Sequence, residues 1–315
     1  MARSSAGAGP WLGGISIFAA AALLALLATP AFALTGGAPT PGAAPPAPPS
    51  RSGSPDPAPS AGEVTLLTAK TWPRKSFYYG ARAPRLRYEI ASDQPSNDLR
   101  VDVVAPDGEV VKSFFRNDIA SETPDSVRWD GAVGKGRPAP NGRYSFRIVP
   151  QNGGGAARRA SSSTAQPLSL GFQLYAYAFP ILGAHDYGGG AGRFGAARSG
   201  HTHEGQDVMA KCGTPLIAAR GGRVQYSGYQ GAAGNYLVID GKGTAYDFGY
   251  MHLREPPPLK AGMTVRTGEP IGVVGDTGDA TACHLHFEIW TPPGWYEGGS
   301  PIDPLPFLKQ WDAYS

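Results

Sequence analysis

Residues 281–290 hold the side chains with the clearest chemical potential in the sequence. Read as a β-strand, the segment alternates, and one face carries His284, His286 and Glu288 while apolar residues occupy the other. The two imidazoles would lie about 7 Å apart along the strand. Neighbouring imidazoles repel when both are charged, so a His-x-His strand is typical of a metal site or a proton transfer. The alternative is a pair of solvated histidines on an exposed face.

All histidines of the chain follow residue 184, at positions 185, 201, 203, 252, 284 and 286. Scattered structural histidines would not be expected to segregate in this way, so the distribution indicates a site. His203 and Asp207 lie four residues apart and could bind one ion if the backbone turns at Gly205. Alone, this spacing is more often a surface turn. We expect His201 to be solvated and His185 to lie in a loop.

Short glycine-punctuated strands must position these side chains. Residues 222–226, 235–239 and 270–274 have strand composition, so the C-terminal part is expected to be a β-domain. Gly188, Gly189, Gly190 and Gly192 lack the Lys-Ser/Thr of a phosphate loop and are interpreted as a groove wall. Glu288 shares a face with His286 and could orient it or simply form a salt bridge.

Residues 63–152 also read as β-structure. Leu99, Val101 and Val103 alternate with polar residues, as do Tyr144, Phe146 and Ile148, which predicts a small β-sandwich. Residues 129–131 and 140–144 resemble the last hairpin of the Ig-like domain of flagellar hook-capping proteins. Residues 62–160 contain 16 lysines and arginines against 11 aspartates and glutamates. We expect a spacer with a solvated basic face, the alternative being a surface that holds an anionic polymer.

The N-terminal residues 1–33 resemble a cleavable export signal. An uncharged apolar run at 11–27 follows Arg3, and Ala31-Phe32-Ala33 is a small-x-small cleavage site. An uncleaved membrane anchor is the alternative, and only that form would bind a membrane. Residues 34–62 are a Pro/Ala-rich linker, and residues 153–166 a second linker. We therefore expect an extracytoplasmic protein, secreted or associated with the cell wall.

Net charge and cysteine content narrow the function further. A net charge of only +3 gives no indication of nucleic-acid binding. The two cysteines, Cys212 and Cys283, suggest one disulfide in an exported chain.

The ordered motifs of residues 167–315 resemble the lysostaphin/LytM family of zinc peptidases, which cleave peptide links in bacterial cell walls. The matching elements are His203-x-Gly205-x-Asp207, Gly234-Asn235-Tyr236, Tyr250-Met251-His252-Leu253, Gly272-x-x-Gly275-x-Thr277-Gly278 and His284-Leu285-His286-Phe287-Glu288. The resemblance implies that His203, Asp207 and His286 bind one Zn²⁺ per chain. It also implies that His252 and His284 are catalytic, acting on the water nucleophile, the oxyanion or the leaving amine.

If this ligand set holds, the two cysteines must lie near each other, because Cys212 follows Asp207 by five residues and Cys283 precedes His286 by three. We therefore predict a Cys212–Cys283 disulfide. Thiolate ligation of zinc is the competing interpretation, and it is disfavoured because Cys283 falls on the strand face opposite His284 and His286.

The sequence thus predicts an all-β protein, an Ig-like β-sandwich followed by an antiparallel β-sheet zinc peptidase domain. Its expected function is endopeptidase hydrolysis of peptidoglycan stem peptides or cross-bridges. The alternatives are an inactive family member that binds cell wall or activates another wall hydrolase, and a structural wall-binding module.

Overall fold

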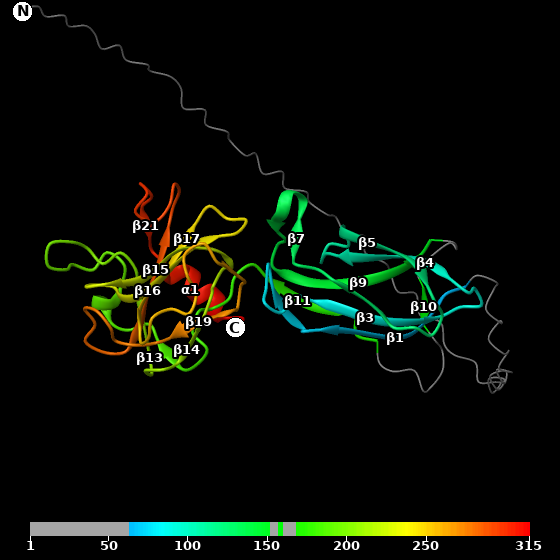
Figure 1. Cartoon of the computed structure of the whole chain (residues 1–315), viewed down its shortest axis with the longest axis horizontal. Helices are drawn as coiled ribbons and strands as arrows, with labels where there is room; N and C mark the ends of the chain where they lie inside the picture. The colour runs from blue at the N-terminus through cyan, green and yellow to red at the C-terminus, as the bar shows by residue number, and fades with distance from the viewer. Residues whose placement is uncertain (1–62, 152–156, 160–167) are drawn as a thin grey trace, which may run out of the picture. The chain divides into compact units, whose positions relative to one another are not determined.

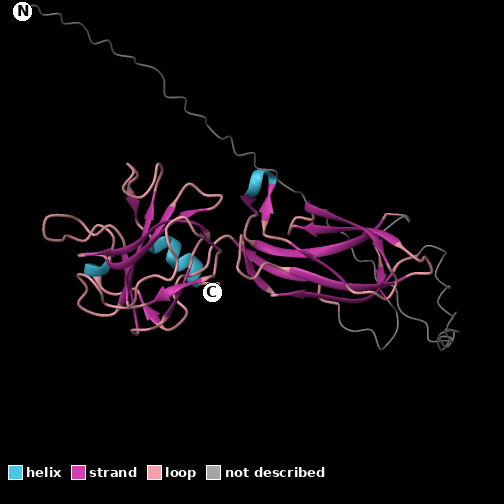
Figure 2. Cartoon of the chain, viewed as in Figure 1, coloured by secondary structure: helices cyan, strands magenta, loops and turns pink. Residues whose placement is uncertain are grey.

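A computed structural model describes residues 63–151, 157–159 and 168–315 of the chain. Strands dominate these residues, and the one α-helix among them is α1 (Leu305–Asp312), as Figure 2 shows. Within the described residues no helix is both long enough and apolar enough to cross a membrane. The expected export signal and proline-rich linker lie outside the described residues.

The N-terminal β region consists of two sheets and a short ribbon (Figure 1). One sheet has the order β10 (Arg158–Arg159), β1 (Thr65–Trp72), β3 (Arg85–Ala91) and β6 (Asp125–Arg128). The other has the order β2 (Lys75–Phe77), β11 (Gly171–Tyr175), β9 (Gly142–Pro150), β4 (Asn97–Val104) and β5 (Val110–Ile119). The ribbon pairs β7 (Ala132–Val133) with β8 (Arg137–Pro138) through the 3₁₀ turn η1 (Gly134–Gly136).

One hydrophobic core joins the two sheets of this region. Leu86 and Ile90 of β3 share it with Val101 of β4 and Phe146 of β9, all fully or almost fully buried. Apolar side chains at alternate positions of each strand therefore face the opposite sheet. The predicted alternation and the sandwich arrangement are confirmed.

Strand β11 extends this region beyond the expected linker. Residues Gly171–Tyr175 pair with both β9 and β2, so they complete the second sheet of the sandwich. The sequence had placed residues from 167 onward in the C-terminal domain. We propose that the division between the two β regions follows Tyr175.

Asp102 is a buried carboxylate on β4. Its side chain is 0% exposed, and burial alone would raise its pKa. Hydrogen bonds from three neighbours outweigh burial and lower the pKa below its usual value; the donors are Ser113 at 2.7 Å, Arg147 at 3.0 Å and Arg100 at 2.9 Å. Ionised Asp102 thus stabilises the sandwich.

The C-terminal β region is built on an eight-stranded sheet whose paired neighbours run antiparallel. Its order is β12 (His185–Asp186), β13 (Gln206–Ala210), β20 (His284–Trp290), β17 (Asp247–Leu253), β16 (Gly234–Gly241), β15 (Gly222–Gln230) and β18 (Thr264–Val265), with β21 (Pro301–Ile302) beside β20. A two-stranded sheet pairs β14 (Pro215–Ile217) with β19 (Pro270–Val273).

Strand β20 lies inside the sheet, and all seven of its residues are buried. Leu285, Phe287 and Ile289 enter the hydrophobic core, where Leu308 and Trp311 of α1 also pack. The intervening residues of β20 therefore face the other side of the sheet. This confirms the predicted alternation and leaves His284, His286 and Glu288 together on the face opposite the core.

Candidate metal centre and catalytic groove

The pairing of β13 with β20 brings the candidate ligands together. Asp207 lies directly opposite His286, and Val208 lies opposite Leu285. Because Val208 and Leu285 are core residues, Asp207 and His286 share the opposite face. His203 precedes β13 and reaches the same point from the adjoining loop.

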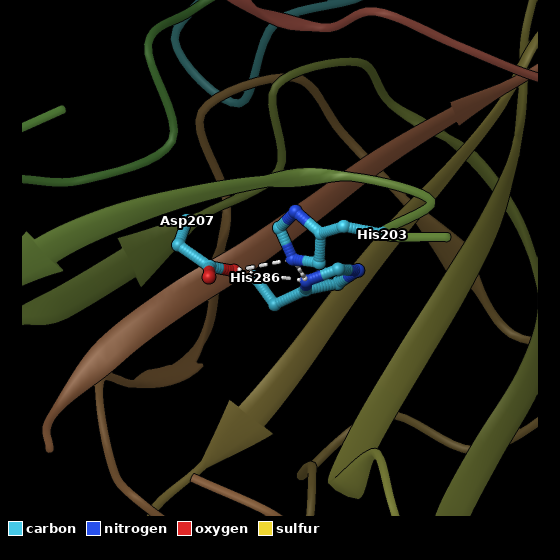
Figure 3. A group of neighbouring side chains, drawn as sticks. All are labelled: His203, Asp207 and His286. Carbon is cyan, nitrogen blue, oxygen red and sulfur yellow. Dashed lines mark hydrogen bonds and ion pairs between the residues drawn. The ribbon is translucent and has the colours of Figure 1, made fainter. Parts of the chain in front are cut away.

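Three ligating atoms converge at this point. Nε2 of His203 lies 3.0 Å from Oδ1 of Asp207 and 2.8 Å from Nδ1 of His286, which lies 2.9 Å from the same carboxylate oxygen. Figure 3 shows the three side chains pointing toward one another. His203 and His286 are 6% and 7% exposed, so both imidazoles are largely shielded from solvent. His203, Asp207 and His286 thus form a candidate metal site.

The outer nitrogen of each imidazole is fixed by a partner. Nδ1–H of His203 donates to the carbonyl of Arg193 at 2.9 Å, and Nε2–H of His286 donates to Oε1 of Glu288 at 2.9 Å. These acceptors assign the tautomers and leave the inner nitrogens for a ligand. Oε2 of buried Glu288 in turn accepts the indole N–H groups of Trp290 and Trp295. Glu288 is therefore held in place to orient His286.

The charges of the cluster match those of a cation site. Burial opposes ionisation of Asp207, yet hydrogen bonds from His203 and His286 hold its pKa far below the usual range. Burial also disfavours the imidazolium of His286, but Asp207 and Glu288 overcome it and raise its pKa to about 9. Without a metal, the imidazolium of His286 therefore offsets part of the negative charge of the carboxylates, and a bound divalent cation would replace its extra proton.

The donor set fits Zn²⁺. Imidazole nitrogen and carboxylate oxygen are normal zinc ligands at about 2.0–2.2 Å, which puts the corners of a tetrahedron about 3.3 Å apart. The atoms here lie 2.8–3.0 Å apart, so a small outward movement would accommodate the ion. A second group of possible ligands, Cys212, Asp276 and Cys283, offers no thiolates because the cysteines form a disulfide with Cα atoms 5.2 Å apart. The predicted disulfide is confirmed, and thiolate ligation is excluded.

His252 enters the site through an irregularity in β17. Phe248, Tyr250 and Leu253 all reach the core, whereas Met251 and His252 both line the groove. Strict alternation would send His252 into the core. Its backbone instead has φ = 60°, in the left-handed region, and the pairing with β16 shifts register at the same place. This backbone conformation therefore accompanies the departure from alternation that brings His252 to the groove.

A hydrogen bond and burial together determine the tautomer and the charge of His252. Nδ1–H donates to the carbonyl of Thr277 at 2.8 Å, which leaves Nε2 as an acceptor. Burial, with smaller contributions from His284 and His286, lowers the pKa of His252 to about 4. The ring is therefore neutral at neutral pH, and its centre lies 4.6 Å from that of His284.

His284 stands between His252 and the ligand cluster. Its Nδ1–H donates to the carbonyl of Ala282 at 2.8 Å, and its Nε2 lies 3.5 Å from Oδ1 of Asp207. The ring is 9% exposed and shares its strand face with His286. The structure thus places all five predicted site residues in one place: His203, Asp207, His252, His284 and His286.

These residues line a groove with a volume of about 770 Å³. Gly188, Gly189 and Gly192 contribute to one part of its lining, as predicted, and Tyr236, Trp295 and Tyr296 to another; the remaining lining includes Arg198, Glu204 and Asp279. The volume suits a short peptide segment.

Arg198 was missed by the sequence analysis. Its Nη2 lies 3.5 Å from Oδ2 of Asp207, on the oxygen that is not directed at the two histidines. Arg198 therefore contacts one carboxylate oxygen of Asp207, and the other oxygen, Oδ1, contacts His203 and His286. No pattern in the sequence distinguishes Arg198 from other loop arginines, so only the fold could reveal it.

Gly205 is required for a reason different from the one expected. Its φ is not positive, so it supplies no unusual turn. A Cβ at this position would lie 2.5 Å from the carbonyl oxygen of Phe287 and 2.6 Å from Nε2 of His286. The backbone at Gly205 therefore passes so close to the histidine that no side chain fits.

The remaining histidines lie outside the cluster. His201 is exposed, and its Nδ1 contacts the carbonyl of Ser199, as expected for a solvated residue. His185 was expected in a loop but lies on the short strand β12, with Nε2 3.2 Å from Asp312 and its ring against Phe179. Its role is to pack this edge of the sheet.

Comparison with known proteins identifies the same segment. Residues 201–304 match the model of Peptidase family M23. Peptidoglycan DD-endopeptidase ShyC of Vibrio cholerae is 42% identical over 87 residues, 28% of this chain and 20% of that protein. Glycyl-glycine endopeptidase ALE-1 of Staphylococcus capitis is 33% identical over 129 residues, 41% of this chain and 35% of that protein. The chain thus spans well under two thirds of these relatives.

Among solved structures, the catalytic domain of lysostaphin from Staphylococcus simulans is similar to the same part of the chain. It is 31% identical, with a TM-score of 0.35, over 40% of this chain and 92% of that chain.

Proposed function

We propose, from the premise that residues 201–304 form a Peptidase family M23 domain, that this chain is a zinc endopeptidase acting on the peptides of peptidoglycan. The carrying observation is the convergence of three ligating atoms of His203, Asp207 and His286 within 3.0 Å of one another, beside two further buried imidazoles. One Zn²⁺ per chain would be held by this set.

Bound Zn²⁺ would supply an activated water and polarise the scissile carbonyl. The residues of the chain would do the rest of the chemistry. Neutral His252, with Nε2 free as an acceptor, suits proton removal from the nucleophile. His284 lies between His252 and Asp207, where a donor could stabilise the oxyanion or protonate the leaving amine. Arg198 and Glu288 would position the ligands.

The substrate class rests on the groove and on the relatives. The names of two relatives specify a peptidoglycan DD-endopeptidase and a glycyl-glycine endopeptidase. Both activities hydrolyse an amide in an extended peptide, which a groove of about 770 Å³ can hold. We propose the same bond class here, in a stem peptide or a cross-bridge.

The proposed location is outside the cytoplasm, in the secreted or wall-associated fraction. The Cys212–Cys283 disulfide supports it, because such bonds persist in oxidising compartments. The substrate also lies there.

The completeness of the site favours an enzyme over a wall-binding or activator protein without catalysis. A chain selected only for binding would not need a neutral buried His252 beside three mutually arranged ligands. Buried polar clusters of this kind cost folding free energy unless they are fully paired.

The test begins with zinc content in the purified full chain. We expect one Zn²⁺ per chain, lost in His203→Ala and Asp207→Ala and retained in His201→Ala, the exposed control. Retention of zinc in both ligand variants would refute the site.

The second measurement is fragment release from two defined substrates, a DD-cross-linked muropeptide dimer and a pentaglycine-bridged one, analysed by mass spectrometry. We expect hydrolysis of one of them. His252→Ala and His284→Ala should keep zinc and lose roughly 10²-fold or more in rate. A zinc-loaded wild-type chain that hydrolyses neither substrate would overturn the enzymatic proposal.

A further inference from the structure

The outer face of the β1–β3–β6 sheet concentrates positive charge. Strand pairing places Trp72 opposite Arg85 and Arg85 opposite Arg128, in one row across the sheet. The next row on the same face places Lys70 opposite Arg87. All five side chains are exposed, and we call this set the basic face: Lys70, Trp72, Arg85, Arg87 and Arg128.

Among the described residues no carboxylate forms an ion pair with a cation of the basic face, although Glu89 of β3 lines the same cleft as Lys70 and Arg87. Arg85 faces Arg128 directly, and Lys70 faces Arg87, although like charges at opposed positions destabilise a sheet. Three other arginines of the same sandwich do have carboxylate partners: Arg116 pairs with Asp125 at 2.7 Å, and Arg100 and Arg147 pair with Asp102. The opposed cations lower the stability of the sheet, so their presence is better explained by the binding of an anionic ligand.

The face is hollowed rather than flat. A cleft with a volume of about 990 Å³ is lined by Lys70, Trp72 and Arg87 on the sheet, with Arg74 and Arg143 beside them. Trp72 is 41% exposed, and the guanidinium of Arg85 lies 5.8 Å from its ring centre. The cleft therefore offers several cations, one aromatic surface and a single carboxylate, Glu89, to the same ligand.

We propose that the basic face binds a linear phosphodiester polymer of the bacterial envelope. Five of the six cations in and around the cleft are arginines, whose planar forks bind phosphate oxygens in pairs. Alternate residues along a strand are about 6.8 Å apart. That spacing matches a flexible chain carrying a single negative charge on each small repeating unit, and the exposed ring of Trp72 suits contact with its sugar or polyol groups.

Other polyanions fit the face less well. A lipid surface would favour a flat or protruding face with several apolar anchors, whereas this cleft is concave and Trp72 is the one large exposed apolar side chain among its described lining residues. Single-stranded nucleic acid is usually held by successive aromatic stacks, and the cleft provides one.

This binding would be separate from the peptidase chemistry. The basic face lies on β1, β3 and β6, whereas the ligand cluster lies on β13, β20 and the loop before β13. Its test therefore uses binding alone, so a failure of either proposal would leave the other standing.

The experiment measures binding of the full chain to fluorescein-labelled poly(glycerol phosphate) by polarisation at 50 and 200 mM salt. We expect the wild-type affinity to fall about tenfold or more between these salt concentrations. Arg85→Gln/Arg87→Gln should weaken binding at low salt by roughly tenfold and reduce the salt slope by about 1.4, from about 0.7 for each cation removed. Unchanged near-ultraviolet circular dichroism and an unchanged urea midpoint would show that the variant is folded.

The matched control is Lys112→Gln/Arg137→Gln, which removes two exposed cations on β5 and β8 and gives the same net charge. We expect it to bind as the wild type does. Equal weakening in both double variants would reduce the effect to net charge and overturn the site. Tighter binding to phosphatidylglycerol vesicles or to oligodeoxythymidine than to the polymer would also overturn the choice of partner.

Discussion

Gly205→Ala would add the smallest possible side chain at the most crowded point of the metal site. Its Cβ would meet the carbonyl oxygen of Phe287 at 2.5 Å and Nε2 of His286 at 2.6 Å. Both atoms belong to β20, and the carbonyl is backbone, so rotation of a side chain cannot relieve the contacts. The strand and its histidine would have to move away from Gly205.

The size of that movement follows from ordinary contact distances. Carbon requires roughly 3.4 Å or more from these atoms, so His286 must shift by about 0.8 Å. The overpacking should cost about 1–3 kcal/mol of folding free energy. A shift of this size exceeds the tolerance of about 0.5 Å for a metal site. We expect a 10- to 100-fold weaker zinc affinity and a loss of about 10² in hydrolysis.

Chelator competition, urea denaturation and muropeptide hydrolysis would measure these three effects. The matched control is Gly189→Ala in the same groove, where φ is −83° and an added Cβ meets nothing within 4 Å. It should keep wild-type zinc affinity and stability. If Gly205→Ala bound zinc as tightly as Gly189→Ala does, the close-approach argument would be refuted.

Three further predictions concern other parts of the fold. Thr277→Val removes a hydroxyl that donates to the Leu253 carbonyl at 2.7 Å, so we expect the hydrolysis rate to fall tenfold or more with zinc retained; an unchanged rate would show that His252 keeps its position without this hydrogen bond. Asp102→Asn should cost about 1–3 kcal/mol at pH 7 in urea denaturation. Because the pKa of Asp102 is lowered on folding, its contribution is present above pH about 4 and is lost as the pH falls further, so the difference from wild type should shrink at pH 3; a constant difference would contradict this. Cys212→Ser/Cys283→Ser opens a 71-residue link and should cost up to about 4 kcal/mol in thermal or urea unfolding, while the folded variant keeps its zinc; loss of zinc without unfolding would implicate sulfur.

Strand β20 shows how far the sequence alone could predict the site. The two-residue period of its apolar and polar side chains determines which face each occupies, and burial of Leu285, Phe287 and Ile289 follows directly. Because β20 supplies only His286 to the ligand set, the other two ligands must come from neighbouring segments, Asp207 from β13 and His203 from the loop before it. The order of the motifs along the chain indicated Asp207 as a ligand. The pairing of β13 with β20 then brings Asp207 directly opposite His286.

His252 could not have been placed by periodicity. Alternation groups it with Phe248 and Tyr250, which are in the core. A left-handed backbone at a histidine is uncommon and carries no signal in the local sequence, so family resemblance alone indicated its role. The strand Gly171–Tyr175 posed a related problem, because its alternation shows that it is a strand but not which sheet it joins.

Contacts that depend on the path of a loop or on strand register were the hardest to predict from the sequence. The ion pair of Arg198 with Asp207 depends on the path of a loop. The opposed cations of the basic face depend on strand register, which is set by the bulge and pairing pattern of β1 and β3. Such features appear only when the chain is folded in three dimensions.

The separation of the ligands along the chain also determines when the metal site can come into being. His203 and Asp207 are neighbours in the polypeptide, but His286 lies 79 residues beyond Asp207 and meets it through the β13–β20 pairing. An unfolded chain therefore presents only a two-ligand fragment of the site, which binds zinc weakly compared with the full set. Zinc acquisition should therefore follow completion of the sheet, and a chain that has not yet paired β13 with β20 would lack the complete ligand set.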